Sequence, residues 1–392
     1  MKKVLILSSF LPYKKTRYTA AGYNTTLDII DELYTQNYIV DFISLVNSEQ
    51  YLEKNQYNNK AIKNLTIFKI TKLKKLLNIL LNIFKPVLCS VRIDSRIKKS
   101  LLKNYQQYDF IIIDYTQNIF YIKYLKDFRG KIVLIEQDVA YQAYERKHKQ
   151  EKNFLKKMLY FLEYNRLKYY EEKLIGKYDL VLVPSQKDFN LIKNKNKNIK
   201  IIKPFFNKIE LLKKEKKEGI SIGFFGAMNR KENEEAVIWF LRNIWKKIQE
   251  KYKKKIKFYI MGANPRLELE KEVKKYNGVI LTGYINRIED YFSFIDIGIV
   301  PLLTGAGIKI KTVEMLYSEI PIISTNIGIE GINIQDGKHF LLANTVEEFK
   351  NKLEILIDNK NIYKYIKRNL KEDKNKLLLG KKITEILEEE IW

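Results

Sequence analysis

Short apolar runs alternate with amphipathic segments along the whole chain, and this alternation predicts strands and helices in turn. Residues 4–9, 39–46 and 110–115 are nearly continuous in Val, Ile, Leu and Phe. Strands that are apolar on both faces are typical of the interior of a parallel sheet. The segments between them repeat apolar residues at helical spacing. The pattern therefore predicts an α/β protein whose parallel sheets are covered by helices.

This alternation is interrupted near the charged run 213–218, which is poor in apolar residues, and it restarts at Ser221. With 392 residues the chain is long enough for two domains of ordinary size. We expect two doubly wound, Rossmann-like domains, an N-terminal one over residues 1–205 and a C-terminal one over 206–370. A final helix over 371–392 is expected to cross back to the first domain.

A glycine-rich stretch follows one of the buried-type strands and leads directly into a helical pattern. Gly305 and Gly307 form the turn, and Lys309 and Lys311 stand at the start of the helix. A strand, turn and helix start in this order aim backbone N–H groups and a positive dipole end at an anion, usually a phosphate. Lysines at this end oppose the dipole, so stability alone does not favour them. Glu314, three residues after Lys311, lies on the same helix face and can accept hydrogen bonds from sugar hydroxyls.

A second strand and small-residue turn follow closely, over Pro321–Thr325 and then Gly328, Ile329 and Glu330. A lone glycine turn between a strand and a helix is more often structural than phosphate-binding. Here two turns, two lysines and a glutamate stand together. The combination predicts a site for a nucleotide diphosphate.

These residues carry a resemblance to a known family. Gly307–Glu314, with Pro321–Thr325 and Gly328–Gly331, resembles the donor-site signature of GT-B glycosyltransferases. More narrowly it resembles family 4 (glycosyl transferases group 1), whose members are retaining and use nucleotide-diphosphate sugars. The likeness extends thinly over nearly the whole chain and is most specific between Gly223 and Gly331. It implies two Rossmann-like domains facing one another across a cleft, with the donor on the C-terminal domain and a glycan or lipid-linked acceptor on the N-terminal one.

The resemblance also implies roles for single residues. The donor-binding residues that it implies around the two turns are Gly305, Gly307, Ile308, Lys309, Lys311, Glu314, Gly328, Ile329 and Glu330. Lys311 would also be catalytic, because it can stabilise the diphosphate leaving group together with helix N-terminal amides at 305–308 and 328–331. The family usually has two glutamates eight positions apart. Glu314 matches the second, whereas Ala306 occupies the first.

Further donor contacts are implied nearer the start of the C-terminal domain. Gly226 matches the family's first turn, but Ala227 stands where many members have an arginine for the diphosphate, so Arg230 or Lys231 would substitute. Tyr284 and Ile285 resemble the segment beside the nucleotide base, so we include them among the donor-binding residues. No Asp-x-Asp motif is present. We therefore expect no metal and no cofactor, with the nucleotide-diphosphate sugar as substrate.

In the N-terminal domain, Gln137 and Asp138 are the catalytic candidates. Related transferases often carry a Glu-His-Asp triplet at a similar strand end, and Gln137 stands in place of the histidine. Glutamine can hydrogen-bond a sugar hydroxyl, but it cannot exchange a proton near neutral pH. Ala21 and Gly22 match an acceptor-side loop, and an ordinary turn before a helix is an equally good interpretation. A dinucleotide fingerprint would need three spaced glycines here, which disfavours a Rossmann-type dehydrogenase.

Composition adds a large positive charge to this picture. The net charge is +26, which implies attraction to a polyanionic surface, although abundant Lys, Asn and Ile are also typical of an AT-rich genome. Cys89 is the only cysteine, which excludes an internal disulfide and fits a reducing compartment.

We find no signal peptide and no run long enough to span a membrane. We expect a cytoplasmic protein that can be peripheral on the inner face of the plasma membrane. His148 and His339 lie outside the motifs and are expected on the surface.

The segment Lys72–Lys85 is basic, rich in leucine and free of acidic residues. Such a helix can lie in a membrane interface. A core helix with solvated lysines at its ends fits the same pattern and is slightly favoured.

Two other functions fit parts of the sequence. A nucleotide-sugar epimerase could share the fold, but it would need acidic residues and histidines that this chain largely lacks. A basic nucleic-acid-binding module could use the charge and the tyrosines. However, the basic residues are spread along the chain rather than grouped in one arm, so no specific nucleic-acid partner is expected.

Overall fold

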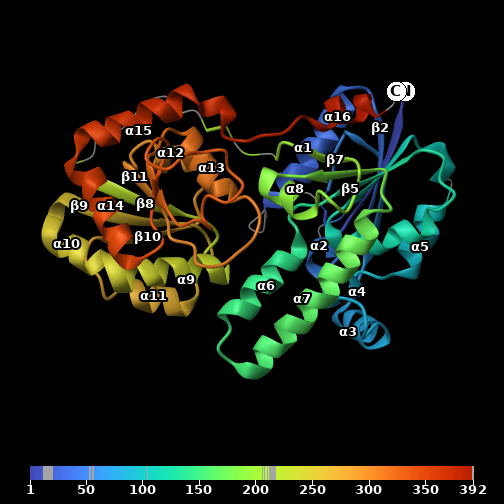
Figure 1. Ribbon diagram of the computed structural model, residues 1–392, viewed down its shortest axis with the longest axis horizontal. Helices are drawn as coiled ribbons and strands as arrows, with labels where there is room; N and C mark the ends of the chain where they lie inside the picture. The colour runs from blue at the N-terminus through green and yellow to red at the C-terminus, as the bar shows by residue number, and fades with distance from the viewer. Residues whose placement is uncertain are drawn as a thin grey trace. The chain divides into compact units, whose positions relative to one another are not determined.

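The computed structural model describes residues 1–11, 21–52, 54, 57–103, 105–204, 206, 208–209, 211 and 218–390. The chain divides into two compact units, Met1–Phe205 with Leu379–Trp392, and Phe206–Leu378 (Figure 1). Each unit has a parallel sheet with helices on both faces. Each unit taken by itself therefore has the doubly wound, Rossmann-like arrangement that the sequence predicts.

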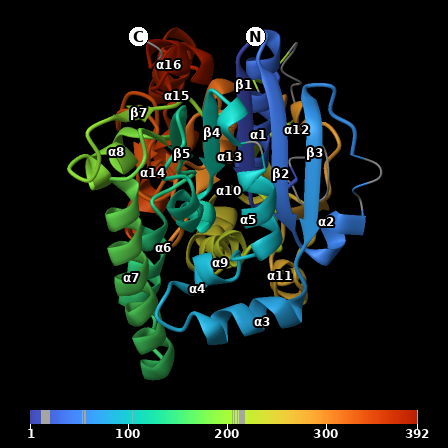
Figure 2. The ribbon, with the colours of Figure 1, turned by 90° about the vertical axis from the view of Figure 1, so that its right-hand side faces the viewer.

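In the first unit the described residues form a seven-stranded sheet in the order β3-β2-β1-β4-β5-β6-β7, and all neighbouring strands are parallel (Figure 2). The strands are β1 (Lys3–Ser8), β2 (Ile39–Val46), β3 (Ile62–Lys69), β4 (Phe110–Asp114), β5 (Lys131–Ile135), β6 (Leu180–Val183) and β7 (Ile199–Ile201). Alternate residues of β1 enter different cores: Leu5 and Leu7 pack on one face of the sheet, Val4 and Ile6 on the other. This double burial explains the continuous apolar runs.

The helices of the first unit lie on both faces of this sheet. They are α1 (Ala21–Thr35), α2 (Ser48–Leu52), α3 (Lys72–Leu81), α4 (Val87–Ser90), α5 (Ser95–Leu102), α6 (Ala140–Gln150), α7 (Phe154–Ile175), α8 (Gln186–Ile192) and α16 (Ile383–Glu389), with 3-10 helices at Tyr105–Gln107 and Thr116–Tyr124. Ser185 accepts a hydrogen bond from the Asp188 N–H and so caps α8, which begins where β6 ends.

The segment after the second unit completes the first. Ile202 and Lys381 form a parallel bridge, and Ile383, Ile386 and Leu387 of α16 join the core beneath β1 and α1. The Glu32 carboxylate accepts hydrogen bonds from the Thr384 N–H at 2.9 Å and from its hydroxyl at 2.5 Å. The sequence predicted that residues 371–392 cross back to the first domain, whereas in the structure the chain returns to the first unit at Leu379. Trp392 lies outside the described residues.

The second unit has a six-stranded parallel sheet among its described residues, in the order β10-β9-β8-β11-β12-β13. Its strands are β8 (Ile220–Phe225), β9 (Ile256–Met261), β10 (Val279–Gly283), β11 (Ile297–Val300), β12 (Ile322–Ser324) and β13 (Leu341–Leu342). Its helices are α9 (Lys231–Phe240), α10 (Lys246–Tyr252), α11 (Leu267–Val273), α12 (Ile288–Phe292), α13 (Ile310–Tyr317), α14 (Val346–Asp358) and α15 (Lys360–Glu372), with a π-helical turn at Leu241–Trp245 and 3-10 helices at Lys253–Lys255 and Lys374–Lys376. One core cluster joins the sheet to helices of both faces.

One sequence expectation about the second unit is wrong. His339 is buried rather than on the surface, because its ring is held on both sides. Nδ1 accepts a hydrogen bond from the Gln335 N–H at 3.0 Å, and Nε2 lies 3.1 Å from Asp373 Oδ2. His339 is therefore a structural residue of the loop before β13.

Candidate active site

The side chain of Lys311 reaches from the first turn of α13 to the carboxyl end of β8. Its Nζ donates a hydrogen bond to Asn233 Oδ1 at 2.5 Å and lies 4.3 Å from the centre of the Phe224 ring. A Cβ atom at Gly226 would lie only 3.2 Å from this amine and 2.9 Å from Asn233 Nδ2. Glycine at the end of β8 therefore leaves room for the amine and the amide to meet there.

Asn233 is a residue of this site that sequence reasoning missed. It is buried in the first turn of α9, and its Nδ2 donates to the Ala227 carbonyl at 2.9 Å. The side chain thus joins the loop after β8 to the Lys311 amine. The sequence feature that could have identified Asn233 is that it is an uncharged amide among the charged residues Lys231–Glu235 at the helix start.

The environment of Lys311 weakens its hold on a proton. Burial, together with the nearby positive charge of Lys309, lowers the pKa of the amine from 10.5 to about 7. Lys311 can therefore change its charge near neutral pH when an anion arrives. An amine in this state suits a site that is completed by a negatively charged ligand.

The glycine-rich turn before α13 folds back on its own lysine. Gly305 and Gly307 have φ values of 121° and 69°, in the left-handed range that favours glycine. The Lys309 Nζ donates to the carbonyls of Ala306 at 3.2 Å and Gly307 at 2.5 Å, and it lies 3.8 Å from Glu330 Oε2. Lys309 therefore ties the first turn to the second.

A further contact links the two turns through Thr312. Its hydroxyl donates to the Gly328 carbonyl at 2.9 Å, and its side chain is fully buried. A Cβ at Gly328 would lie 2.2 Å from Ser324 Oγ, so only glycine fits. The sequence expectation of helix N-terminal amides at 328–331 is wrong, because Gly328 to Gly331 form turns rather than a helix start. Ile329 and Glu330 belong to the same turns.

Glu314 is buried within α13, with 6% of its surface exposed. A carboxylate that merely solvated a helix face would be exposed. Ile308, just before α13, is partly buried and packs against the core of the unit.

The other donor-binding candidates lie at the surface. Arg230 is the residue before α9, without a capping hydrogen bond from its side chain, and lies 3.9 Å from Glu232, whereas Lys231 lies 3.4 Å from Glu235 one turn on. Both basic side chains are more than half exposed. Tyr284 is 61% exposed, whereas its neighbour Ile285 packs partly against the core. An exposed tyrosine ring beside a sheet end is available for stacking.

In the first unit, Asp114 at the end of β4 organises the catalytic candidate Gln137. Its Oδ1 accepts a hydrogen bond from Gln137 Nε2 at 3.0 Å, and its Oδ2 accepts from Ser8 Oγ at 2.8 Å and Thr26 Oγ1 at 2.9 Å. Burial raises the pKa of this carboxyl from 3.8 to about 6, against the effect of these hydrogen bonds. The sequence pointed to Gln137 but not to Asp114, which joins three strand ends and α1.

Two buried glutamates support the segment that contains Asp138. Glu136 and Glu171 are fully buried and hydrogen-bonded to one another, and burial raises the pKa of both carboxyls above their usual range. Because the two carboxyl groups interact, the ionisation of one makes the ionisation of the other less favourable. Glu171 also accepts hydrogen bonds from the N–H groups of Ala140 at 2.9 Å and Tyr141 at 3.1 Å. It therefore fixes the start of α6, directly after Asp138.

Comparison with known proteins places this geometry in a family context. Residues 219–359 match the family described as glycosyl transferases group 1. This segment contains β8, both glycine turns, Asn233 and Lys311. The chain is a glycosyltransferase with the GT-B fold.

The transferase is 25% identical over 363 residues to an uncharacterised 44.6 kDa protein in the cps region of Klebsiella pneumoniae, covering 88% of each chain. Its fold is similar to that of Anabaena Alr3699/HepE in complex with UDP and glucose, with a TM-score of 0.63, 12% identity and 96% coverage of each chain. It is also similar to an S. aureus TarM mutant in complex with Fondaparinux, alpha-GlcNAc-glycerol and UDP. That likeness has a TM-score of 0.65 and 12% identity, and it covers 100% of this chain and 99% of TarM.

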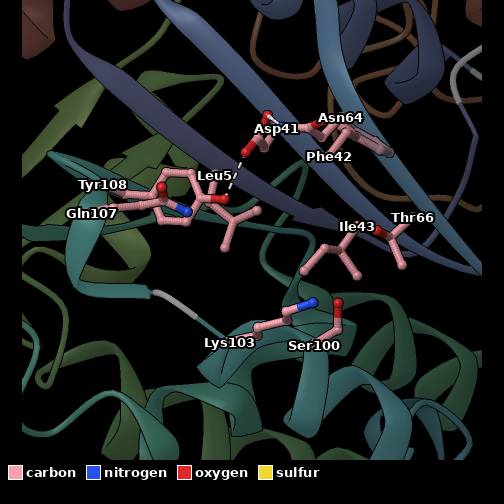
Figure 3. A pocket seen from close by; sticks show the side chains of 10 residues that line it. All are labelled: Leu5, Asp41, Phe42, Ile43, Asn64, Thr66, Ser100, Lys103, Gln107 and Tyr108. Carbon is pink, nitrogen blue, oxygen red and sulfur yellow. Dashed lines mark hydrogen bonds between the residues drawn. The ribbon is translucent and has the colours of Figure 1, made fainter.

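Two remaining features of the transferase lie apart from these residues. A cavity of about 220 Å³ in the first unit is lined by β1, β2 and β3 and by the segment from α5 to Tyr108 (Figure 3). Inside it, Asp41 accepts hydrogen bonds from the Tyr108 hydroxyl at 2.7 Å and from Asn64 Nδ2 at 2.9 Å. The acceptor-side candidates Ala21 and Gly22 open α1, but their surroundings lie outside what the structure describes.

No metal site is found within the described ranges, where His, Cys, Asp and Glu side chains form no group of three or more that could hold an ion. In the same part of the chain, no helix is both long and apolar enough to cross a membrane.

Proposed function

We propose that the transferase moves a sugar from a nucleotide-diphosphate sugar to a glycan or lipid-linked acceptor in the synthesis of a cell-surface polysaccharide or glycolipid. The observation that carries this proposal is the meeting of Lys311, Asn233 and Gly226 at the end of β8, beside the glycine turn before α13. The match of this unit to group 1 transferases supports it. We also propose that the enzyme belongs to family 4.

The donor-side chemistry follows from the charges of the site. The bond between the sugar's anomeric carbon and the diphosphate oxygen breaks, and negative charge develops on the leaving nucleoside diphosphate. Lys311 takes up a proton from solvent when the nucleotide-diphosphate sugar binds, and the resulting ammonium neutralises the charge that develops, which lowers the barrier because the interaction is stronger in the transition state than in the ground state. Glu314 accepts hydrogen bonds from the ribose, and Tyr284 lies beside the base. Arg230, Lys231 and the Gly305–Ile308 turn complete the donor contacts.

On the acceptor side, a hydroxyl oxygen forms the new bond to the anomeric carbon and loses its proton. Gln137, held by Asp114, binds a hydroxyl of the transferred sugar, and Asp138 lies next to it in sequence. Glutamine cannot accept the proton. We propose that the leaving diphosphate takes it, with retention of configuration and without a metal.

UDP is the first nucleotide to test, because the structures of HepE and TarM each contain UDP. The cps-region relative supports a polysaccharide pathway. A thermal-shift panel of UDP, GDP, ADP and CDP, each with and without EDTA, tests the donor site. Stabilisation by one nucleoside diphosphate, unaffected by EDTA, is expected. If none of them raises the melting temperature at millimolar concentration, the proposed donor site is wrong.

Transfer itself is tested with the matching nucleotide sugars, by measuring release of the nucleoside diphosphate. Slow hydrolysis to free sugar is expected even without an acceptor, and NMR of the first-formed anomer reports the configuration. An interconversion of nucleotide sugars without release of nucleotide would instead identify the epimerase.

A further inference from the structure

Helix α3 exposes the apolar side chains that a core helix would bury. Of its ten residues only Asn78 is buried, whereas its leucines face solvent. Leu73 is 67% exposed and Leu81 78%, and Phe84 in the following turn is 81% exposed. The sequence expectation of a core helix is therefore wrong for this segment. An apolar surface of this kind on a soluble domain marks an interaction site.

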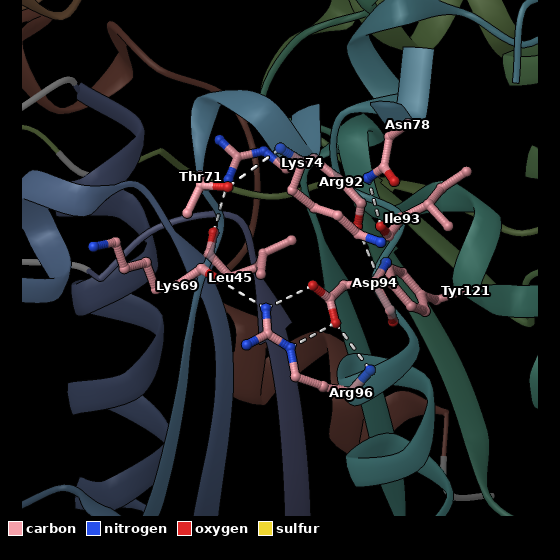
Figure 4. A network of polar contacts seen from close by, with 10 residues as sticks. All are labelled: Leu45, Lys69, Thr71, Lys74, Asn78, Arg92, Ile93, Asp94, Arg96 and Tyr121. Carbon is pink, nitrogen blue, oxygen red and sulfur yellow. Dashed lines mark hydrogen bonds and ion pairs between the residues drawn. The ribbon is translucent and has the colours of Figure 1, made fainter. Parts of the chain in front are cut away.

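A polar network mounts α3 on the first unit by its inner side (Figure 4). The Thr71 hydroxyl caps the helix by accepting from the Lys74 N–H at 3.2 Å, and Asn78 Nδ2 donates to the Ile93 carbonyl at 2.7 Å. Below it, Arg92 donates to the Leu45 carbonyl at 2.7 Å. These contacts fix the orientation of α3, so its exposed leucines are a stable feature of the surface.

A second apolar surface projects from the start of α7. The first nine residues of this helix, up to Leu162, include six large apolar side chains that are all at least 42% exposed. They are Phe154, Leu155, Met158, Leu159, Phe161 and Leu162. The first core residue of α7 is Leu167. The tip of the α6–α7 hairpin is thus apolar around much of its circumference, a pattern that isolated water-exposed helices do not show.

The two surfaces lie on the same side of the first unit. Figures 1 and 2, which are turned by 90° from one another about the vertical, both draw α3 and the start of α7 at the bottom. A direct contact joins the regions, because the Val87 N–H after α3 donates to Glu163 Oε2 of α7 at 2.9 Å. We call α3 with residues 82–85, together with residues 146–162, the basic apolar face.

Positive charge is concentrated around this face. Residues 69–103 hold ten Lys and Arg against one acidic residue, Asp94, which pairs with Arg96 at 2.8 Å. Residues 146–157 hold six Lys and Arg against Glu151. Two copies of such a face would repel one another. A nucleic acid would match the charge but not the leucines, and stacking on it would use aromatic side chains instead. An anionic bilayer matches both, since it offers negative head groups above an apolar interior.

We propose that the basic apolar face docks the first unit on an anionic lipid bilayer, with α3 lying in the interface and the α6–α7 tip entering it at a second point. Two separate contacts would fix the unit's orientation on the membrane, which a single amphipathic helix would not do. The inference concerns lipid alone and holds whether or not a sugar donor binds the second unit.

The test is flotation of the full-length protein with vesicles of phosphatidylcholine alone or with phosphatidylglycerol added. Strong binding to the anionic vesicles at low salt is expected, with a steep fall as added salt shortens the Debye length to about 8 Å and below. Two variants address the two contacts: Leu80→Ser with Leu81→Ser in α3, and Phe154→Ser with Leu155→Ser in α7. Each pair should weaken partitioning at least about tenfold, because several apolar side-chain surfaces no longer leave water. The four changes together should abolish binding.

Matched controls separate docking from general surface hydrophobicity. Leu52→Ser and Leu267→Ser change leucines that are 78% and 72% exposed outside the face, and they should leave binding unchanged. Because all of these side chains are exposed, every variant should keep the wild-type circular dichroism and melting temperature. Phe154→Trp provides a further readout, since quenching of its fluorescence by brominated lipid reports entry into the bilayer.

Several results would overturn the proposal. Binding that is equal on neutral vesicles and indifferent to salt would exclude the charge-dependent contact. Variants that bind vesicles like the wild type would exclude the apolar one. A dimer that dissociates in the α3 or α7 variants, measured by sedimentation velocity without lipid, together with unchanged vesicle binding, would show that the face contacts a second copy of the chain.

Discussion

Replacing Lys311 by methionine should weaken nucleotide binding and stabilise the protein at the same time. The lysine amine is held beside Asn233 and the Phe224 ring, with less access to the water that an ammonium group prefers. Methionine fills a similar volume without the amine. A buried lysine that destabilises the folded protein is expected where its positive charge is needed to bind a ligand.

The cost can be bounded from the pKa. Its fall from 10.5 to about 7 corresponds to at most about 5 kcal/mol at pH 7, at about 1.4 kcal/mol for each pKa unit. Lys311 is only partly buried, and the variant leaves Asn233 Oδ1 without this donor, which costs about 1–3 kcal/mol. We therefore expect a net gain of about 1–2 kcal/mol. For a domain of this size the melting temperature should rise by roughly 2–8 °C.

The effect has a defined pH dependence. Between pH 10.5 and 7 the unfolded chain binds a proton at Lys311 that the folded chain lacks, so wild-type stability rises with pH in this window. Lys311→Met lacks this contribution. The difference in melting temperature between variant and wild type should be full below pH 7 and should shrink at pH 9.

The assay for binding is calorimetry with UDP at pH 8 in buffers of different ionisation enthalpy. The wild type should take up close to one proton per nucleotide, because the diphosphate restores the charge of a mostly neutral Lys311. Lys311→Met should take up none and should bind about 10- to 100-fold more weakly. Lys247→Met, which changes an exposed lysine of α10, is the control and should change neither quantity. A Lys311→Met protein that binds UDP within twofold of wild type and melts at or below the wild-type temperature would refute this role for the amine.

Other residues give independent tests. Glu314→Gln should cost about 10- to 100-fold in UDP affinity with little change in melting temperature, measured by calorimetry and circular dichroism. Asn233→Ala should weaken UDP binding several-fold by releasing the Lys311 amine, and an unchanged affinity would make Asn233 a purely structural residue. Asp114→Asn should remove a loss of stability of up to about 3 kcal/mol that the wild type suffers as pH rises from about 4 to 6, seen in urea unfolding at each pH. Gly328→Ala should destabilise the protein by at least about 2 kcal/mol, because its Cβ would lie 2.2 Å from Ser324 Oγ.

The sequence predicted most of the strands and their parallel arrangement, but not their order, because strands buried on both faces leave continuous apolar runs. It also predicted the glycine turn before α13, since a strand, a turn and a helix start are local features. The same local reasoning failed at Gly328. A small-residue turn with two glycines has the same sequence signature whether or not a helix follows it.

Contacts between distant segments were beyond the sequence. Lys311 was predicted to meet a phosphate, but its partner Asn233 lies 78 positions away and is brought to it only by the neighbouring positions of β8 and β11 in the sheet. Asp114 lay near the end of the predicted strand 110–115, but its hydrogen bond to Gln137 depends on the pairing of β4 with β5. For α3, a stripe of leucines does not reveal whether protein or solvent lies beside it. In the structure Asn78 is the buried residue of α3, so the leucines of the helix lie on its solvent side.

The return of the chain to the first unit has a consequence for synthesis on the ribosome. Core residues Ile383, Ile386 and Leu387 are translated only after the whole second unit, Phe206–Leu378. At about 5–20 residues per second, roughly 9–35 seconds pass while the second unit is translated, and during this time the surface beneath β1 and α1 stays uncovered. The second unit, in contrast, is a single continuous stretch and can complete its core first. We expect ribosome-bound chains truncated before Leu379 to show a protease-resistant second unit next to a first unit that is still open to cleavage.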